Sequence, residues 1–484
     1  MRDRSSVVGA SLVTLAVLVM LTVPLISRAG SVSAPIPVSF GPNINLTSRG
    51  DAVGQDEHET TVAVNPHDSR NIVEGHIDHK PGQSAVTFSS SADGGQTWTF
   101  GGPAPLEGAG EASSDPAIAA DADGNFYYAY LDTQSGSNFT RPDVVVARST
   151  DGGRSFPFLS LVRRGANNTS VFDIPDKDYV AVDTWAKSPF RGTIYVAWSN
   201  IICTATGCDV RIMVSRSIDR GETWSAGLAI SSPRDAETAD ATGPLPVIAP
   251  DGTIYVFYAD YLFHTGPLNI LFTKSKDGGL TWTAPAAVAA GLPSPGLILI
   301  KNNATNYGVK PFLGILGNSF PTAAIAPDGT IFVAWTDVPN GSCQDIGDFY
   351  VPCSNTDVRL SVSSDGGKTW SAPRKVSDET NATDQFFPWM AAHPGGLVSL
   401  AWDDKRLDPT NTNYNVFYTN TFDGVSFLPN VRVTSETSLT GNQQTPIQDY
   451  SGLAASADAV FPVWADTRSS SHPDVYVAVG RLNP

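Results

Sequence analysis

The chain has 484 residues with 31 basic and 48 acidic side chains, so its formal net charge is −17 at pH 7. An acidic surface repels phosphate backbones, which excludes nucleic acid as the expected partner. With 41% hydrophobic residues, 43 glycines and 35 prolines, the sequence is typical of a large folded body built from many short elements joined by turns.

The N-terminal segment, residues 1–34, is expected to be a signal peptide or an N-terminal anchor. Two arginines precede an uncharged apolar stretch, residues 7–26, and small residues follow it. This arrangement is typical of an export signal, and the stretch also approaches the roughly 20 residues that span a bilayer. Both alternatives place residues 35–484 outside the cytoplasm, either secreted or held at a membrane through this segment alone.

A short glycine-rich box recurs along residues 35–484. The copy "SSDGGKTW" begins at Ser363, and a decayed copy, "TFDGVSF", begins at Thr421. The five near-complete boxes carry the aspartates Asp93, Asp151, Asp219, Asp277 and Asp365. Recurrence at this spacing predicts an array of repeats or a propeller.

A second repeat gives the number of units. Seven β-rich runs each end in an aromatic residue, one further residue, and then Asp or Asn. These pairs are His76 and Asp78, Tyr130 and Asp132, Trp198 and Asn200, Tyr258 and Asp260, Trp335 and Asp337, Trp402 and Asp404, and Trp464 and Asp466. The chain therefore has one more unit than it has box-like segments.

Each unit divides into four short runs that are rich in β-branched and aromatic residues and separated by Gly, Pro and Asp turns. This pattern predicts an all-β fold, a β-propeller of four-stranded blades, with seven blades expected and six as the alternative. The seventh unit stops before its fourth strand, while "IPVSFGPNINLTS" supplies a strand ahead of the first unit. We expect this N-terminal strand to complete the last blade and close the ring, leaving no open edge.

The four cysteines fall in two inserts between predicted strands. Cys203 and Cys208 flank "TATG", and Cys343 and Cys353 flank a longer loop. The spacings predict two local disulfides, in agreement with an oxidising compartment. A zinc site is the competing interpretation, which the unequal spacings and the lack of a nearby histidine disfavour.

The boxes resemble the Asp-box, or BNR, repeats of the sialidase superfamily, and the resemblance covers nearly all of the chain after Ala34. It implies a β-propeller whose site lies on the face away from the boxes. It implies no single reaction, since the superfamily also includes xyloglucanases and non-enzymatic propellers. In each box we expect the Asp to accept hydrogen bonds from its own turn and Gly to supply positive φ. Because the box recurs in five blades, we expect it to have a structural role rather than to form a single catalytic centre.

Singular residues on the opposite face are the candidates for function. Aligning the innermost strands places Glu59, Asp115, Lys177 and Tyr450 at matching positions of blades 1, 2, 3 and 7, with Asp176 beside them. At this position we expect blades 4 to 6 to carry Pro244, Pro321 and Phe387. The polar residues are thus predicted to gather on one side of an axial funnel.

Two arginines, Arg406 in "WDDKR" and Arg468 in "WADTR", occur only in blades 6 and 7. A guanidinium suits bidentate binding of a carboxylate such as that of a sialic acid. The alternative, left open by the sequence, is that each arginine pairs with a nearby aspartate.

The resemblance implies a retaining sialidase mechanism, with Tyr450 as nucleophile, Glu59 as its activator and Asp115 as acid/base. Arg406, Arg468, Asp176 and Lys177 would bind the substrate. The family's arginine-isoleucine-proline motif is absent, however: the nearest text is "DIPDKDY". Whether the protein is an enzyme therefore stays open at this point.

Three functions are compatible with the sequence. The first is a secreted glycoside hydrolase of the exo-α-sialidase type, and the second is a non-catalytic propeller that binds glycan or protein. The third, a xyloglucanase-type hydrolase, needs two carboxylates and resembles a two-propeller arrangement that 484 residues cannot hold. We expect a carbohydrate partner, a monomer, no metal-ligating residues and no obligatory cofactor. Calcium is the alternative, because aspartates are frequent on the loops.

Overall fold

The computed structural model divides the chain into two units, Met1–Ser33 and Ala34–Pro484. The residues that it describes are 33–47, 56–80, 83–108, 112–135, 140–167, 172–236, 238–262, 267–293, 297–299, 314–315, 320–339, 342–343, 352–439, 450–468 and 472–483. Residues 1–32 of the predicted N-terminal signal or anchor lie outside these ranges. No helix within the described ranges is long and apolar enough to cross a membrane.

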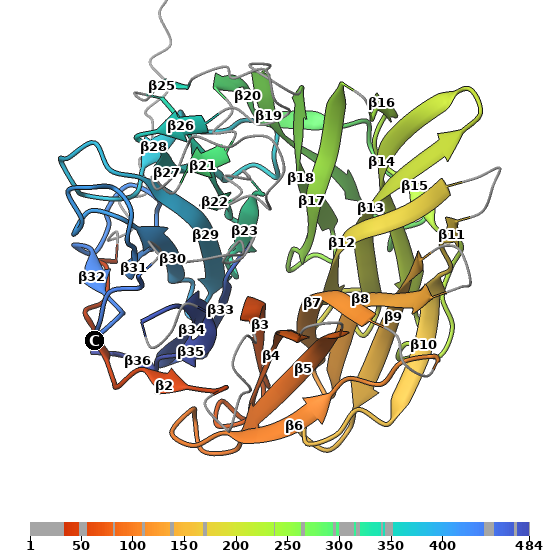
Figure 1. Cartoon of the computed structure of the whole chain (residues 1–484), viewed down its shortest axis with the longest axis horizontal. Helices are drawn as coiled ribbons and strands as arrows, with labels where there is room; N and C mark the ends of the chain where they lie inside the picture. Colours follow the sequence, from red (N-terminus) through yellow and green to blue (C-terminus); the bar gives the residue numbers. More distant parts are fainter. Residues whose placement is uncertain are drawn as a thin grey trace, which may run out of the picture. The chain divides into compact units, whose positions relative to one another are not determined.

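The second unit is a ring of seven four-stranded antiparallel blades, as predicted (Figure 1). All described regular elements are strands.

The first four blades take consecutive segments of the chain. Blade 1 contains β3 (Asp56–Val64), β4 (Ile72–Lys80), β5 (Gln83–Ser91) and β6 (Thr99–Pro103). Blade 2 contains β7 (Ala112–Ala120), β8 (Phe126–Ser135), β9 (Thr140–Ser149) and β10 (Phe158–Arg163). Blade 3 contains β12 (Phe172–Val182), β13 (Ile194–Thr204), β14 (Gly207–Ser217) and β15 (Leu228–Ala229), with β11 (Ala166–Asn167) and β16 (Arg234–Asp235) added. Blade 4 contains β17 (Ala239–Ile248), β18 (Ile254–Leu262), β19 (Pro267–Ser275) and β20 (Ala286–Pro293).

The last three blades follow the same order. Blade 5 contains β23 (Thr322–Ile325), β24 (Ile331–Asp337), β27 (Asp357–Ser363) and β28 (Arg374–Lys375). Blade 6 contains β29 (Gln385–Ala392), β30 (Val398–Asp404), β31 (Asn415–Thr421) and β32 (Val431–Arg432). Blade 7 contains β33 (Gly452–Ala455), β34 (Ala459–Asp466) and β35 (Asp474–Val477). A small separate sheet is formed by β21 (Leu297–Leu299), β22 (Gly314–Ile315), β25 (Ser342–Cys343) and β26 (Pro352–Ser354).

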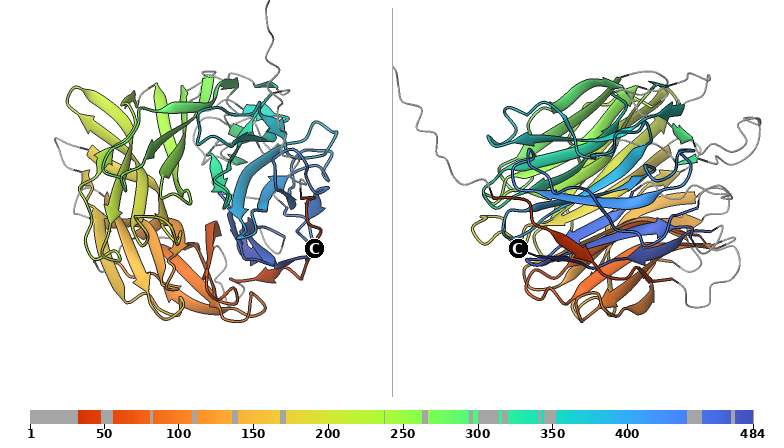
Figure 2. Two further views of the ribbon diagram at one scale, coloured as in Figure 1. Left: turned by 180° about the vertical axis from the view of Figure 1, so that it is seen from behind. Right: turned by 90° about the vertical axis from the view of Figure 1, so that its left-hand side faces the viewer.

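The N-terminal strand closes the ring, as predicted. The fourth strand of blade 7 is β2 (Ile44–Asn45), which pairs antiparallel with β35 through Ile44 and Val477. Beside it, β1 (Val38–Phe40) pairs with β36 (Gly480–Leu482), which in turn pairs with β34. The red and blue ends of the chain accordingly lie side by side (Figure 2). Because blade 7 combines both ends of the described chain, its outer edge is covered rather than left unpaired.

Apolar side chains fill the interface between each pair of neighbouring blades. Phe88 and Phe126, for example, belong to one buried cluster between blades 1 and 2. The aromatic residue of each box packs against the preceding blade, as Phe156 does in this cluster. The other box aromatics take the same place in the next clusters: Trp98, Trp224, Trp282, Trp370 and Phe427. The box therefore holds the ring together from blade to blade.

Hydrogen bonds inside the turn satisfy the box aspartate. In blade 2, Asp151 accepts bonds from the Ser149 hydroxyl at 2.7 Å, the Ser155 hydroxyl at 2.7 Å and the Arg154 backbone N–H at 3.0 Å. Gly153 has a φ of 80°, and a Cβ there would lie 2.0 Å from Val73 of blade 1. The turn needs glycine both for its conformation and for its close approach to the neighbouring blade.

The registers define two faces. At one end of blade 1, Val64 pairs with Ile72, and Ile72 pairs with Ser91 at the start of the box. At the other end, Asp56 pairs with His79, which pairs with Ser84. The innermost strand thus begins on the face opposite the boxes and ends on the box face.

Candidate functional site

A β-bulge interrupts the start of the innermost strand in five blades. In blade 1 the pairing with β4 shifts between His58 and Thr61, and the same shift recurs in blades 2, 3, 4 and 6. Each bulge holds one residue in the left-handed region, with φ between 49° and 63°. These residues are Glu59, Asp115, Lys177, Gly243 and Phe387. A bulge re-aims a side chain, and non-glycine residues in this conformation are strained and cluster at functional sites.

The bulges correct the sequence alignment of blades 4 and 5. The predicted positions were Pro244 and Pro321, but Gly243 is the left-handed residue of the blade 4 bulge. In blade 5, Thr322 pairs with Ala334 as Thr61 pairs with Gly75 in blade 1, so the residue two positions earlier, Phe320, is the equivalent of Glu59. The proline follows the bulge residue in these blades. Phe387 of blade 6 does occupy the expected place. The polar residues are still confined to blades 1, 2, 3 and 7, where the equivalent positions carry Glu59, Asp115, Lys177 and Tyr450.

The innermost strands face one another at the centre of the ring (Figure 1). Contacts join these residues from blade to blade: Tyr450 to Glu59, Lys177 to Tyr450, and the Lys177 N–H to Asp115. We call them, with Asp176, the axial cluster. The Tyr450 hydroxyl donates a hydrogen bond to the Glu59 carboxylate at 3.3 Å, although the two residues are 391 positions apart in the chain. Tyr450 is 3% exposed, and the Glu59 side chain is 13% exposed. The structure thus brings the predicted nucleophile and its predicted activator into contact.

Asp115 and Asp176 form a carboxyl pair on the neighbouring blades. Desolvation raises the pKa of Asp176 to about 8, and the adjacent Asp115 adds to the shift by its charge and by a hydrogen bond between the two carboxyl groups. A hydrogen bond between carboxyl groups needs one shared proton. Asp176 as a whole residue is exposed, although its carboxyl group is desolvated. The pair is therefore an accessible proton donor at neutral pH.

Asp178, one residue after Lys177, is 1% exposed, and neither of its carboxyl oxygens has a hydrogen-bond partner within the described part of the chain. Burial raises its pKa well above the usual range, with Asp115 adding to the shift. Burial thus favours the neutral form of Asp178, while the charge of Lys177 acts in the opposite direction. The text "DIPDKDY" contains this residue, but nothing in its spacing shows that the side chain is enclosed.

Aromatic rings surround the Lys177 ammonium group. Its Nζ lies 2.8 Å from the centroid of the Tyr450 ring, 5.2 Å from that of Tyr179 and 5.3 Å from that of Phe320. Trp389 of blade 6 packs 5.6 Å from Tyr179, across the ring. Tyr179, Phe320 and Trp389 were not among the functional residues predicted from the sequence. Tyr179 and Trp389 each stand two positions after a bulge residue, which is the signal that could have identified them.

Two further titratable groups border the axial cluster. Burial lowers the pKa of His58 to about 4, so this ring is neutral at pH 7 and forms no ion pair with Glu59, 3.7 Å away. Desolvation raises the pKa of Asp240 to about 6, although the Tyr261 hydroxyl donates a hydrogen bond to it at 3.1 Å. The surroundings of the cluster are thus acidic or neutral.

The structure favours the ion-pair interpretation of the two arginines. Arg406 binds Asp404 at 2.7 Å and stacks on Phe417, which lies in the third strand of its blade. Arg468 binds Asp466 at 2.5 Å and stacks on Tyr476, also in a third strand. Both guanidinium groups face the outer strands rather than the axial cluster. In this arrangement their charges are already balanced.

The aromatic-x-Asp repeat is a structural device. In four blades the indole N–H of a tryptophan donates a hydrogen bond to the Asp or Asn side chain two residues later, at 2.8 to 3.2 Å. The donors are Trp198, Trp335, Trp402 and Trp464. The repeated aspartates are thus held by their own strand, and Asp404 and Asp466 then hold the two arginines.

Cys203 and Cys208 form the predicted disulfide, which closes the hairpin between β13 and β14 on the face opposite the boxes. Cys343 and Cys353 are paired in the register of β25 and β26, but their side chains lie outside the described residues, so the second predicted bridge stays a prediction.

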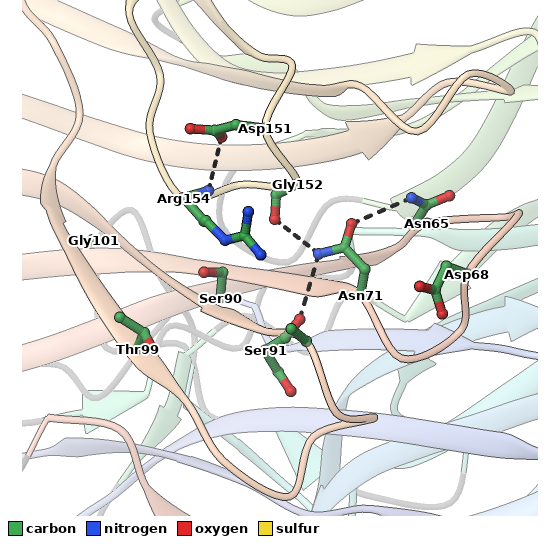
Figure 3. A pocket seen from close by; sticks show the side chains of 11 residues that line it. Asn65, Asp68, Asn71, Ser90, Ser91, Thr99, Gly101, Asp151, Gly152 and Arg154 are labelled. Atoms are coloured by element: carbon green, nitrogen blue, oxygen red, sulfur yellow. Dashed lines mark hydrogen bonds between the residues drawn. The ribbon is translucent and has the colours of Figure 1, made fainter.

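A hollow of about 360 Å³ lies on the box face between blades 1 and 2 (Figure 3). Its polar side chains already hold the two blades together. Asn71 donates to the Gly152 carbonyl at 2.8 Å and accepts a bond from Asn65, while Asp151 binds its own turn (Figure 3). Hydrogen bonds lower the pKa of the two acids that line this hollow, Asp68 and Asp151, so neither is suited to donate a proton at neutral pH. The axial cluster, not the hollow, is the candidate site.

Within the described ranges, no group of three or more His, Cys, Asp or Glu side chains is arranged to hold a metal ion. The expectation of no obligatory cofactor, with calcium as the alternative, stays a prediction.

Comparison with known proteins agrees with this architecture. No family model matches the chain. A sialidase from Micromonospora viridifaciens is 23% identical over 322 residues, which cover 60% of this chain and 49% of that protein. The chain thus spans about half the length of that relative.

Among solved structures, a polysaccharide lyase of the ulvan lyase type is similar with a TM-score of 0.50 and 11% identity, covering 87% of this chain and 93% of the lyase. The Hadza microbial sialidase Hz136 gives a TM-score of 0.45 and 15% identity, over 92% and 93% of the two chains. The chain is thus a β-propeller that is similar in sequence to a sialidase.

Proposed function

We propose that this protein is a glycan-acting enzyme, a glycoside hydrolase that works through the axial cluster. The observation that carries the proposal is the 3.3 Å hydrogen bond from Tyr450 to Glu59. A tyrosine hydroxyl is a weak nucleophile until a neighbouring base removes its proton, and a carboxylate at hydrogen-bond distance is such a base. A sialidase among the relatives supports the same class of reaction.

The proposed reaction has two steps. Glu59 accepts the Tyr450 proton while the Tyr450 oxygen bonds to the anomeric carbon. The glycosidic C–O bond breaks, and the leaving oxygen takes a proton from the Asp115–Asp176 pair. In the second step, the pair accepts a proton from water, the water oxygen bonds to the anomeric carbon, and the tyrosine oxygen leaves and recovers its proton from Glu59.

The exo-α-sialidase type is the finer proposal. Its support is the sialidase relative and the choice of a neutral tyrosine over a carboxylate, which would be repelled by an anionic sugar. Arg406 and Arg468 are turned away in this arrangement. Binding of a sugar carboxylate would thus require Lys177 or a rearrangement of the arginines.

Secretion is part of the proposal. The Cys203–Cys208 disulfide supports an oxidising compartment, because such bridges persist outside the cytosol. The partner is a carbohydrate, and the protein is proposed to work as a monomer.

A non-catalytic propeller that binds glycan or protein is the second candidate. The burial of Tyr450, only 3% exposed, favours it, since a nucleophile must reach its substrate. The same face would then bind its partner through the exposed parts of the blades without cleaving it.

The test is turnover of fluorogenic sialosides and of a panel of neutral glycosides by the purified protein. We expect release from at least one class of glycoside and its loss in Tyr450→Phe. Tyr255→Phe is the matched control, because Tyr255 is also buried, at 4% exposure, but its hydroxyl binds Gly366 on the box face. Saturable glycan binding without turnover would replace the hydrolase by the binding module.

A further inference from the structure

Lys177 stands out among the basic residues because its charge has no conventional partner. The residue is 3% exposed, and its Nζ has no hydrogen-bond acceptor within the described ranges. A buried ammonium group without a partner is costly, so its position calls for a compensating interaction. Its ammonium group lies over the face of the Tyr450 ring, 2.8 Å from Nζ to centroid.

The backbone fixes this contact. Lys177 is a bulge residue with a φ of 52°, and its N–H donates to the Asp115 carboxylate at 3.3 Å. The ring of Tyr179 packs 5.8 Å from that of Tyr450 and encloses the ammonium group from the same side. The left-handed conformation therefore serves to direct the lysine side chain at Tyr450.

Two carboxyl groups near this contact, those of Asp176 and Asp178, also interact with the charge of Lys177, which lowers their pKa against the effect of burial. Burial has the largest effect on Asp178 and raises its pKa well above the usual range, which favours its neutral form. His58 is neutral, because burial lowers its pKa to about 4. The remaining titratable groups of the cluster, besides Lys177 and Tyr450, are Glu59, Asp115 and Asp176.

We propose that Lys177 stabilises the phenolate form of Tyr450 and so acts as the electrostatic activator of the nucleophile. A cation over a phenol ring is attracted by the π-electrons, and the attraction grows when the ring becomes a phenolate. When the Tyr450 proton moves to Glu59, the negative charge moves from the carboxylate to the ring that lies under the ammonium group. Lys177 thus offsets the negative charge both before and after the proton moves from Tyr450 to Glu59. The inference rests on the proposed function of this site.

Spectrophotometric titration of tyrosine tests the inference without turnover. The difference between the wild-type protein and Tyr450→Phe isolates the ionisation of Tyr450. In Lys177→Met we expect its ionisation constant to fall by at least about tenfold, a shift of roughly one pH unit. Lys177→Arg, which keeps a cation, should restore most of the shift. An unchanged titration in Lys177→Met overturns the inference.

The wild-type protein alone provides a second test in case Lys177→Met does not fold. Tyr128 and Tyr130 are fully buried, and among the described residues no cation lies over either ring; burial raises the pKa of both well above the usual range. Tyr450 should ionise at a lower pH than either, identified by the same comparison with Tyr450→Phe. If Tyr450 does not ionise before the protein unfolds in alkali, the inference is wrong.

Activity separates this inference from the proposed function. If the wild type hydrolyses a glycoside through Tyr450, Lys177→Met should lower kcat by at least about tenfold with little change in KM. An unchanged kcat overturns the role of Lys177 and leaves the hydrolase standing. If no glycoside is turned over, the proposed function fails, while the titration still decides whether Lys177 stabilises the phenolate.

Discussion

Aspartates on the two faces of this propeller have pKa values that are shifted in opposite directions. On the box face, hydrogen bonds from Thr223 and Ser217 lower the pKa of Asp219 to about 2. At the axial cluster, desolvation and the neighbouring Asp115 raise the pKa of Asp176 to about 8. The side chain is the same in both places. The difference is that the turn supplies donors to the box aspartate, whereas the cluster supplies another acid.

The comparison separates architecture from chemistry. Where the sequence repeats, each aspartate is satisfied by its own turn and holds a blade in place. Where the repeat fails, in blades 1, 2, 3 and 7, polar groups are left in strained or poorly solvated positions. Perturbed proton affinities of this kind are characteristic of functional sites.

The largest expected effect is on turnover. Glu59→Gln removes the group that accepts the Tyr450 proton, so we expect kcat to fall by roughly 10²–10⁴-fold on a hydrolysed glycoside. The matched change on the other face, Asp219→Asn, should leave kcat within about twofold, since it alters no group that takes part in proton transfer. Equal losses in the two variants would remove the distinction between the faces.

Arg468→Ala tests the role of Asp466, an aspartate of the aromatic-x-Asp repeat that lies on the face opposite the boxes. The Asp466 side chain is fully buried, and removal of its arginine leaves that charge uncompensated, so we expect a loss of about 3 kcal/mol in the free energy of unfolding. Arg220→Ala is the control, because both Arg220 and its partner Asp123 are exposed, and it should cost under about 1 kcal/mol. Denaturant titration measures both. A similar small loss in both variants would show that Arg468 is available for substrate.

The stability of Asp178→Asn should depend on pH in a defined direction. Between the usual carboxyl pKa near 3.8 and the raised value in the fold, native Asp178 holds a proton that the unfolded chain releases. The wild type therefore loses stability as pH rises, by up to about 1.4 kcal/mol per pH unit from this group. The variant lacks this loss, so its stability relative to the wild type should increase from pH 4.5 to pH 7.5. Denaturant titrations across that range would contradict the account if the difference stayed constant.

The smallest expected effect is at a box. Asp151→Asn weakens hydrogen bonds within one exposed turn, so we expect a loss of about 1 kcal/mol in stability. Turnover should not change. Loss of turnover at normal stability would place function on the box face.

The sequence predicted the propeller because its period is carried by residues that the fold uses in every blade. The aromatic-x-Asp pairs gave seven units, since the tryptophans and the side chains two residues later are hydrogen-bonded partners. The contact of Tyr450 with Glu59 was also foreseen, because the starts of all innermost strands meet at the axis.

The remaining features depend on local geometry that periodicity does not encode. In blade 4 the residue equivalent to Glu59 is Gly243 and not Pro244, because the extra residue of the bulge displaces the register without altering the spacing of apolar residues. The orientation of Arg406 depends on the packing of its guanidinium group on Phe417. The sequence allowed this arginine either to bind a substrate carboxylate or to pair with an aspartate, and it did not distinguish the two. The burial of Asp178 likewise appears only once the blades are assembled.

The most direct test is the pH dependence of kcat for the wild type, Asp176→Asn and Asp219→Asn on one hydrolysed glycoside. Asp176 must be protonated to donate, and its raised pKa keeps it so below about pH 8; we therefore expect wild-type kcat to fall as pH rises through about 8. Asp219→Asn should retain both this limb and its rate, whereas Asp176→Asn should lose most of its activity. The account is contradicted if Asp176→Asn keeps the wild-type profile while Asp219→Asn loses it.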